Sequence, residues 1–156
     1  MQINAIGTNS ASQPLGSMAI TRREPGPDDV QIAIDYCGVC HSDVHQARSE
    51  WAGTLYPCVP GHEIVGRVTA VGSRVSGHAV GDLVGVGCMV DSCKECEECR
   101  DGQEQNCLNG AVGTYNSEDV DGTITQGGYS QKVVAWHAAT TKTTPLVLTP
   151  LRIALW

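Results

Sequence analysis

The chain of 156 residues is long enough for one domain with its own hydrophobic core. Its net charge of −7 argues against nucleic acid or an anionic membrane surface as the main partner. No apolar run has the length of a membrane span and the first residues do not resemble a secretory leader, so we expect a cytoplasmic protein with no membrane segment.

Short strands are predicted in the first part of the chain. Residues 1–8 alternate loosely and can open a sheet, and residues 18–23 predict a second strand. Residues 30–36 alternate apolar and polar side chains, which predicts a half-buried strand. A short helix is expected over 42–48, with Ser42 as its N-cap.

Three further strands are predicted downstream. They cover residues 61–72, in which glycines permit close backbone approach, then 81–87 and finally 127–135. Short strands separated by turns, with little helix, predict a mainly β domain that resembles a compact barrel.

Four cysteines between the last two predicted strands have the spacing of a zinc site. Cys93, Cys96 and Cys99 follow one another at two-residue gaps, and Cys107 comes after seven further residues. Four sulfurs form a closed tetrahedral cage with no position for water, which favours structural over catalytic zinc. A disulfide framework and an iron–sulfur cluster are the alternatives. Eight cysteines in a chain without a recognisable leader favour metal in a reducing compartment.

Cys40 and His62 form a second candidate metal pair, because one ends a predicted strand and the other begins one. Glu63 follows His62 directly and could be a third ligand or tune the site. Ser42 and His45 could pass a proton from such a metal towards solvent.

Other polar and aromatic residues near this pair have two interpretations each. Asp43 could hold His62 or another ligand through an outer hydrogen bond. Trp51 is either a core residue or a wall of a substrate pocket. Small buried apolar roles are expected for the remaining cysteines outside the lobe, and surface or packed roles for two histidines: Cys37, Cys58, Cys88, His78 and His137.

Taken together, these motifs resemble the zinc-containing medium-chain alcohol dehydrogenases, and in particular the cinnamyl-alcohol-dehydrogenase type, which often acts as an NADP-dependent aldehyde reductase. The resemblance rests on residues 38–43, on 60–63 with Gly66 and Gly72, and on the four cysteines, all in the family's order. It runs from Met1 to about Ala135. It implies a GroES-like β-barrel-type domain over 1–135, with a zinc lobe at 88–110.

The resemblance also assigns roles to individual residues. It implies that Cys40 and His62 bind a catalytic zinc whose coordination shell Glu63 can enter or leave. Ser42 would contact the alcohol oxygen and His45 would continue the proton relay, while Trp51 is similar to a residue that can line the substrate pocket. Structural zinc would be held by Cys93, Cys96, Cys99 and Cys107. The cofactor of the family is NADP(H), and its substrates are small alcohols and aldehydes.

The sequence departs from the family pattern after the last predicted strand. The family's further catalytic-zinc cysteine follows the strand near Val133, whereas the last cysteine here is Cys107. No G-x-G-x-x-G pattern occurs in the chain. We therefore expect a truncated dehydrogenase with a divergent tail at 136–156 and no dinucleotide-binding domain. We expect this chain alone to be inactive.

Two alternatives belong to other functional classes: an inert zinc-binding remnant or interaction module, and a thiol protein that buffers metal or redox state. Self-association through the exposed domain face, or through the apolar segment 146–156, is a further expectation.

Overall fold

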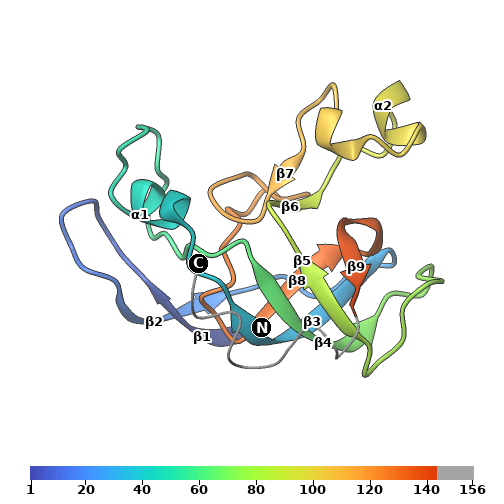
Figure 1. The fold of residues 1–156 in the computed structure, drawn as a ribbon, viewed down its shortest axis with the longest axis horizontal. Helices are drawn as coiled ribbons and strands as arrows, with labels where there is room; N and C mark the ends of the chain where they lie inside the picture. The colour runs from blue at the N-terminus through green and yellow to red at the C-terminus, as the bar shows by residue number, and fades with distance from the viewer. Residues whose placement is uncertain (144–156) are drawn as a thin grey trace.

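Antiparallel β-strands make up most of the regular secondary structure in this computed structural model, in which residues 1–143 are described (Figure 1). A five-stranded sheet has the order β8–β3–β4–β5–β9, and two hairpins pair β1 with β2 and β6 with β7. The strands are β1 (Gln2–Gly7), β2 (Gly16–Thr21), β3 (Asp29–Cys37), β4 (Ile64–Val71), β5 (Leu83–Val86), β6 (Met89–Asp91), β7 (Val112–Gly113), β8 (Lys132–Trp136) and β9 (Thr140–Lys142). The predicted mainly β class is confirmed.

Helices are short in the described part of the chain. They are α1 (His41–Ala47), α2 (Glu97–Arg100) and two 3₁₀ turns, Glu104–Asn106 and His137–Ala139. Within residues 1–143, no helix has both the length and the apolarity that a membrane crossing requires.

The core lies on the five-stranded sheet, and β3 pairs there with both β4 and β8. Val30 and Ile32 of β3 are fully buried and pack with Val68, Val84 and Val133 from neighbouring strands. Branched side chains of this kind suit a pleated, buried surface. A smaller cluster under the β1–β2 hairpin contains Ile3, Ala5, Ile20 and Val59. Strict alternation of exposed and buried residues along β1 confirms the prediction of an opening strand.

Three predicted elements differ from the structure. The predicted strand 127–135 is regular only from Lys132, because Gly127 and Gly128 lie against the Pro60–Gly61 backbone. The Gly128 amide donates to the Gly61 carbonyl at 2.8 Å, so the backbone of this segment is hydrogen-bonded to the loop before β4 and not to a neighbouring strand. Predicted strands 61–72 and 81–87 shorten to β4 and β5. The sequence interpretation missed β6, β7 and β9.

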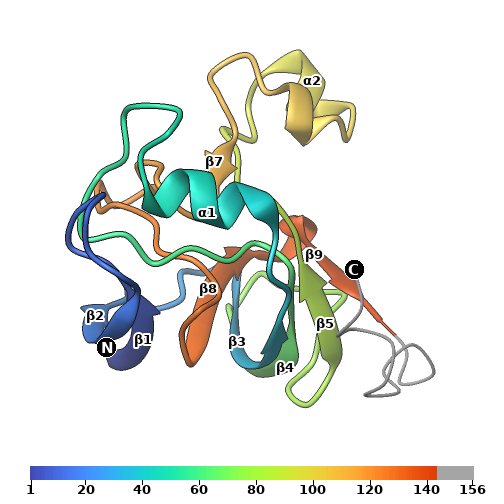
Figure 2. The same cartoon turned by 60° about the vertical axis from the view of Figure 1, so that its left-hand side comes forward.

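The arrangement of the elements brings the predicted site residues to one end of the sheet. Figure 2 shows the lobe that contains α2 projecting beyond β7. The boundary predicted at residue 135 stays a prediction; β9 follows it and pairs with β5. The behaviour predicted for residues 146–156 falls outside the described residues.

Candidate metal centres

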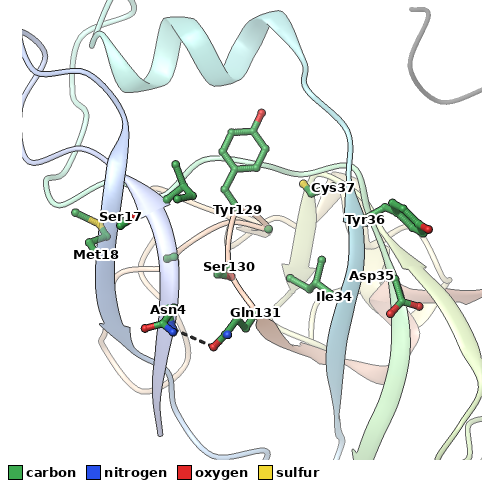
Figure 3. A pocket seen from close by; sticks show the side chains of 13 residues that line it. Asn4, Ser17, Met18, Ile34, Asp35, Tyr36, Cys37, Tyr129, Ser130 and Gln131 are labelled. Carbon is green, nitrogen blue, oxygen red and sulfur yellow. Dashed lines mark hydrogen bonds between the residues drawn. The ribbon is translucent and has the colours of Figure 1, made fainter. Parts of the chain in front are cut away.

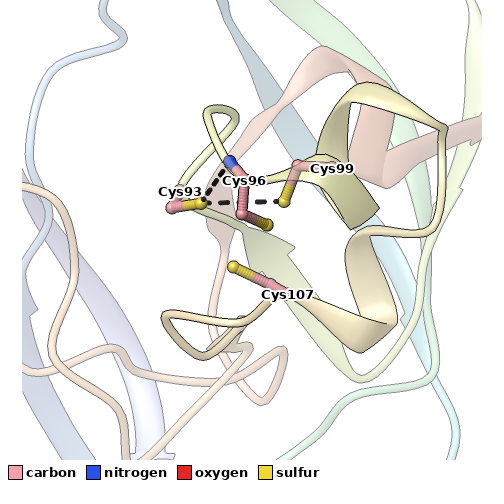
Figure 4. Close-up of side chains that lie close together, drawn as sticks. All are labelled: Cys93, Cys96, Cys99 and Cys107. Carbon is pink, nitrogen blue, oxygen red and sulfur yellow. Dashed lines mark hydrogen bonds between the residues drawn. The ribbon is translucent and has the colours of Figure 1, made fainter.

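The first candidate centre is the lobe of four cysteines, whose sulfurs converge on one point (Figure 4). The ligand atoms of Cys93, Cys96, Cys99 and Cys107 all lie within 4.8 Å of one another. The Cys93 and Cys99 sulfurs are 3.8 Å apart. A tetrahedron with Zn–S bonds of about 2.3 Å has sulfurs about 3.8 Å apart, whereas a disulfide needs about 2.05 Å. The geometry therefore fits zinc, and the disulfide alternative is not supported.

Backbone amides prepare the Cys93 thiol to bind a cation. The turn after Cys93 is tight, with Lys94 in the left-handed region at φ 64°. The amides of Glu95 and Cys96 donate to the Cys93 sulfur at 3.5 and 3.4 Å. These two donors lower the pKa of the Cys93 thiol to about 6. Because the thiolate is the form that ligates metal, the loop favours the state a zinc ion requires.

The second candidate centre contains Cys40, His62 and Glu63, whose ligand atoms also lie within 4.8 Å of one another. β3 and β4 are antiparallel, with Cys37 opposite Ile64, so the end of one strand lies beside the start of the other. This pairing brings together two ligand segments that are about twenty residues apart. Thiol, imidazole and carboxylate are a donor set that zinc uses, and three protein ligands leave a coordination position open.

A buried carboxylate ties the two ligand segments together. Asp43 is 3% exposed. Its Oδ2 accepts hydrogen bonds from the Cys40 amide at 2.9 Å and the Tyr129 hydroxyl at 2.9 Å, and its Oδ1 accepts from the Gly61 amide at 2.9 Å. The prediction that Ser42 caps α1 is wrong, because the N-cap is Cys40 and Asp43 satisfies its amide. The predicted outer contact of Asp43 goes to ligand backbone, not to the His62 ring.

The predicted relay residues lie on α1 beside this centre. Ser42 Oγ is 3.5 Å from His62 Nε2, at the limit of a hydrogen bond. His45 Nδ1 is hydrogen-bonded to the Glu50 carboxylate. This contact lowers the pKa of Glu50 below its ordinary value. Glu50 was not singled out in the sequence, although it lies only five positions after His45.

Trp51 lies against the relay histidine and not in the core. Its ring is 4.8 Å from the ring of His45, and 60% of the residue is exposed. Of its two interpretations, the core role is therefore wrong. The role as a pocket wall stays a prediction.

Tyr115 is a second residue that the sequence interpretation missed. Its hydroxyl is 3.1 Å from His62 Nδ1, and its ring stacks on the imidazole at 5.5 Å with an interplanar angle of 18°. Burial raises the pKa of Tyr115 to about 12, so the hydroxyl stays protonated at neutral pH. No local pattern could reveal this contact, because the two residues are 53 positions apart.

A large open hollow lies away from the point where the metal ligands converge. An open groove of about 730 Å³ runs between the β1–β2 hairpin and the last residues of β3 (Figure 3). Tyr129 and Cys37 line it, but none of the predicted ligands does. A smaller groove of about 420 Å³ includes Glu63. The convergence of ligand atoms is more specific evidence for a metal site than the size of a groove, so we locate the candidate site at Cys40, His62 and Glu63.

The cysteines and histidines predicted to be structural fall into two groups. Burial raises the pKa of Cys37 and Cys58 to about 11, as expected for inert thiols in apolar surroundings. Cys88 is exposed, so the prediction that it is buried is wrong. His78 is packed, with Nε2 at 3.1 Å from the carbonyls of His137 and Thr140.

Comparison with known proteins gives a consistent assignment. Residues 26–145 match the family described as "Alcohol dehydrogenase GroES-like domain". The chain is 67% identical over 135 residues to "Aldehyde reductase YahK" of Escherichia coli, covering 86% of this chain and 38% of that protein. It is 55% identical over 132 residues to "NADP-dependent alcohol dehydrogenase C" of Mycobacterium bovis, covering 85% of this chain and 38% of that protein.

Solved structures agree with the sequence relatives. The fold is similar to CAD from Helicobacter pylori complexed with NADP(H), with a TM-score of 0.87, 40% identity, and coverage of 92% of this chain and 42% of that chain. It is similar to cinnamyl alcohol dehydrogenase 4 from Sorghum bicolor, with a TM-score of 0.88, 38% identity, and coverage of 93% and 41%. The chain thus spans about two fifths of the length of these proteins.

Proposed function

Because this chain belongs to the alcohol dehydrogenase GroES-like domain family, we propose that it is the zinc-binding part of an oxidoreductase that interconverts alcohols and aldehydes with NADP(H). The observation that carries the proposal is the convergence of Cys40, His62 and Glu63 from two adjacent strand ends. The four-cysteine lobe, the first candidate centre, supports the proposal as a structural metal site.

The residues at the second centre suit the chemistry of a carbonyl oxygen. Zinc held by Cys40, His62 and Glu63 would polarise that oxygen as a Lewis acid. Ser42, whose Oγ is 3.5 Å from His62 Nε2, would hydrogen-bond the substrate oxygen. His45, hydrogen-bonded to Glu50, would exchange the oxygen's proton with solvent. Trp51, packed on His45 and largely exposed, would form one wall of the substrate site.

The nicotinamide cofactor enters the proposal through the relatives. One is named an NADP-dependent alcohol dehydrogenase and one solved structure is complexed with NADP(H). Dinucleotide-binding folds of the βαβ type need parallel strands, but every strand pairing in residues 1–143 is antiparallel. We therefore assign the metal and substrate side of the reaction to these residues, and not the cofactor site.

The test is direct binding of an aldehyde to the metal. An aromatic aldehyde with a para-amino donor absorbs at longer wavelength when its carbonyl oxygen binds a Lewis acid. The zinc-saturated chain is expected to shift this band, and Cys40→Ser is expected to abolish the shift. Cys88→Ser is the matched control, because Cys88 is exposed and belongs to neither ligand group. An unshifted band with the saturated wild-type chain would contradict the proposal.

An inert zinc-binding module is the second candidate, and one observation favours it. The lobe offers four ligands, three of them half-buried and one buried, whereas the second centre offers three, of which Glu63 is exposed. A chain of this kind would hold zinc only in the lobe. Zinc at one per chain under saturating conditions, with no response of the aldehyde band, would favour this candidate.

Turnover by the chain alone is a separate expectation. We expect no oxidation of NADPH with an aromatic aldehyde, since hydride transfer depends on holding the nicotinamide ring against the substrate. Micromolar NADPH binding with turnover above a metal-free blank would show that a cofactor site exists. A reducing cytoplasmic location belongs to the same proposal, because thiol ligands must stay reduced there.

A further inference from the structure

We propose that Tyr115 is a positioning residue for His62: its hydroxyl accepts a hydrogen bond from Nδ1–H and so presents Nε2 to the metal. The inference rests on the proposed function, because it concerns the second metal centre. It assigns a role to a residue that lies far from both ligand segments in the sequence and close to them in the structure.

The two ring nitrogens of His62 have different surroundings. Nδ1 is 3.1 Å from the Tyr115 hydroxyl, while Nε2 faces Ser42 Oγ at 3.5 Å. A neutral imidazole carries one proton and one lone pair, and a metal requires the lone pair. A partner on Nδ1 that holds the proton there leaves Nε2 free, and such outer hydrogen bonds also fix the ring plane of a ligating histidine.

Stacking adds a second restraint on the same ring. The Tyr115 and His62 rings are 5.5 Å apart and nearly parallel at 18°. The Tyr115 hydroxyl therefore restricts rotation of the His62 imidazole about its bond to Cβ, and the Tyr115 ring face restricts tilting of the imidazole. Stacking stabilises an aromatic pair beyond the area that the pair buries, so the ring and the hydroxyl of Tyr115 have separable effects.

Residues on both sides of Tyr115 are anchored, which makes it a rigid support. Thr114 is 2% exposed, and it donates through its amide to the Cys88 carbonyl at 3.0 Å and through its hydroxyl to the Gly87 carbonyl at 2.6 Å. Asn116, in the left-handed region at φ 56°, accepts the Leu55 amide on Oδ1 at 2.7 Å. Hydrogen bonds therefore tie this segment on one side to the residues between β5 and β6, and on the other side to the loop that follows α1.

The same segment emerges from the base of the four-cysteine lobe. Tyr115 follows β7, and β7 pairs with β6, whose last residue is two positions before Cys93. The hairpin that carries the lobe thus also sets the position of Tyr115. This arrangement gives the lobe a role in the second centre that does not require any contact between the two metals.

The test uses the full 156-residue chain and two variants that each remove one phenolic hydroxyl. Tyr115→Phe keeps the stacked ring and removes the acceptor. Tyr56→Phe is the matched control, because its hydroxyl donates to the Ala47 carbonyl at 2.8 Å and does not contact a ligand. The first readout is the affinity for the second equivalent of zinc, measured against a chromophoric chelator after the lobe is filled. The second readout is the His62 tautomer, from long-range ¹H–¹⁵N NMR of the zinc-bound wild-type chain, assigned with His62→Gln.

We expect Tyr115→Phe to weaken the second zinc about 10- to 100-fold, the range found for outer-shell partners of metal ligands, and Tyr56→Phe to leave it unchanged. The wild-type spectrum should show protonated Nδ1 and metal-bound Nε2. Wild-type affinity in Tyr115→Phe, or Nδ1 as the ligating atom, would overturn the role of Tyr115 while leaving the metal centre intact. A wild-type chain that takes up only one zinc would overturn both the centre and this inference.

Discussion

Asp43→Asn should release both ligand segments of the second centre at once. The buried carboxylate accepts three hydrogen bonds, from the Cys40 amide, the Gly61 amide and the Tyr129 hydroxyl. The amide side chain keeps one acceptor oxygen and replaces the other with a donor. In either orientation, at least one wild-type donor faces an NH₂ group, and if the oxygen stays near Cys40 that donor is the Gly61 amide.

The magnitude follows from these contacts. A hydrogen bond to a charged group contributes about 1.5–3 kcal/mol, and an unsatisfied buried donor adds to the loss. The free energy of unfolding should therefore fall by about 2–4 kcal/mol. For a chain of this size the melting temperature should fall by about 5–15 °C.

The assay is thermal unfolding followed by circular dichroism, with zinc affinity measured in parallel. Asp101→Asn serves as the control, since Asp101 is exposed and its side chain has no hydrogen-bond partner in residues 1–143. We expect the Asp43 variant to lose stability and to bind the second zinc more weakly, with the lobe unaffected. A melting temperature within about 1 °C of wild type, the range of neutral surface changes, would refute the reasoning.

Two further predictions concern the cysteines. Cys96→Ser should lose the zinc of the lobe and expose residues 93–107 to limited proteolysis, because metal binding and local folding are coupled; full zinc content with an unchanged protease pattern would contradict the cage. Iodoacetamide at pH 8 should modify exposed Cys88 but not Cys58, which is 2% exposed and whose pKa burial raises to about 11. The pKa of Cys58 is higher in the folded than in the unfolded state. The contribution of this thiol to the free energy of unfolding is therefore fully present below the unfolded pKa of 9.0 and is lost as the pH rises towards 11. Equal rates of modification at Cys58 and Cys88, measured by mass spectrometry of the peptides, would show that burial does not protect the thiol.

Parts of this structure that depend on local pattern could be predicted from the sequence. The alternation of residues 30–36 predicts the strand β3, although its burial does not alternate, because its first four residues are all buried. The two-residue cysteine gaps are a turn geometry that needs no tertiary information. The pairing of Cys40 with His62 could also be predicted, because one ends a predicted strand and the other begins one.

Features that depend on distant contacts could not be predicted in this way. Tyr115 reaches His62 because the β6–β7 hairpin and the loop after α1 meet, and neither short strand has a periodic signal. α1 begins at His41, and the amide of its N-cap Cys40 donates to Asp43; sequence preference alone does not decide between this start and one capped by Ser42. A cysteine outside both ligand groups is expected to be buried, but Cys88 lies in the connection between β5 and β6 and is exposed.

The central claim is that this domain has two zinc centres of unequal strength. The most direct measurement is zinc per chain by elemental analysis, first at saturating zinc and then after mild chelation. We expect two zinc ions at saturation and one after chelation, the latter held by the four-cysteine lobe, since four thiolates form a closed site and three mixed ligands an open one. One zinc at saturation would contradict the second centre, and two zinc ions that survive chelation would contradict its three-ligand composition.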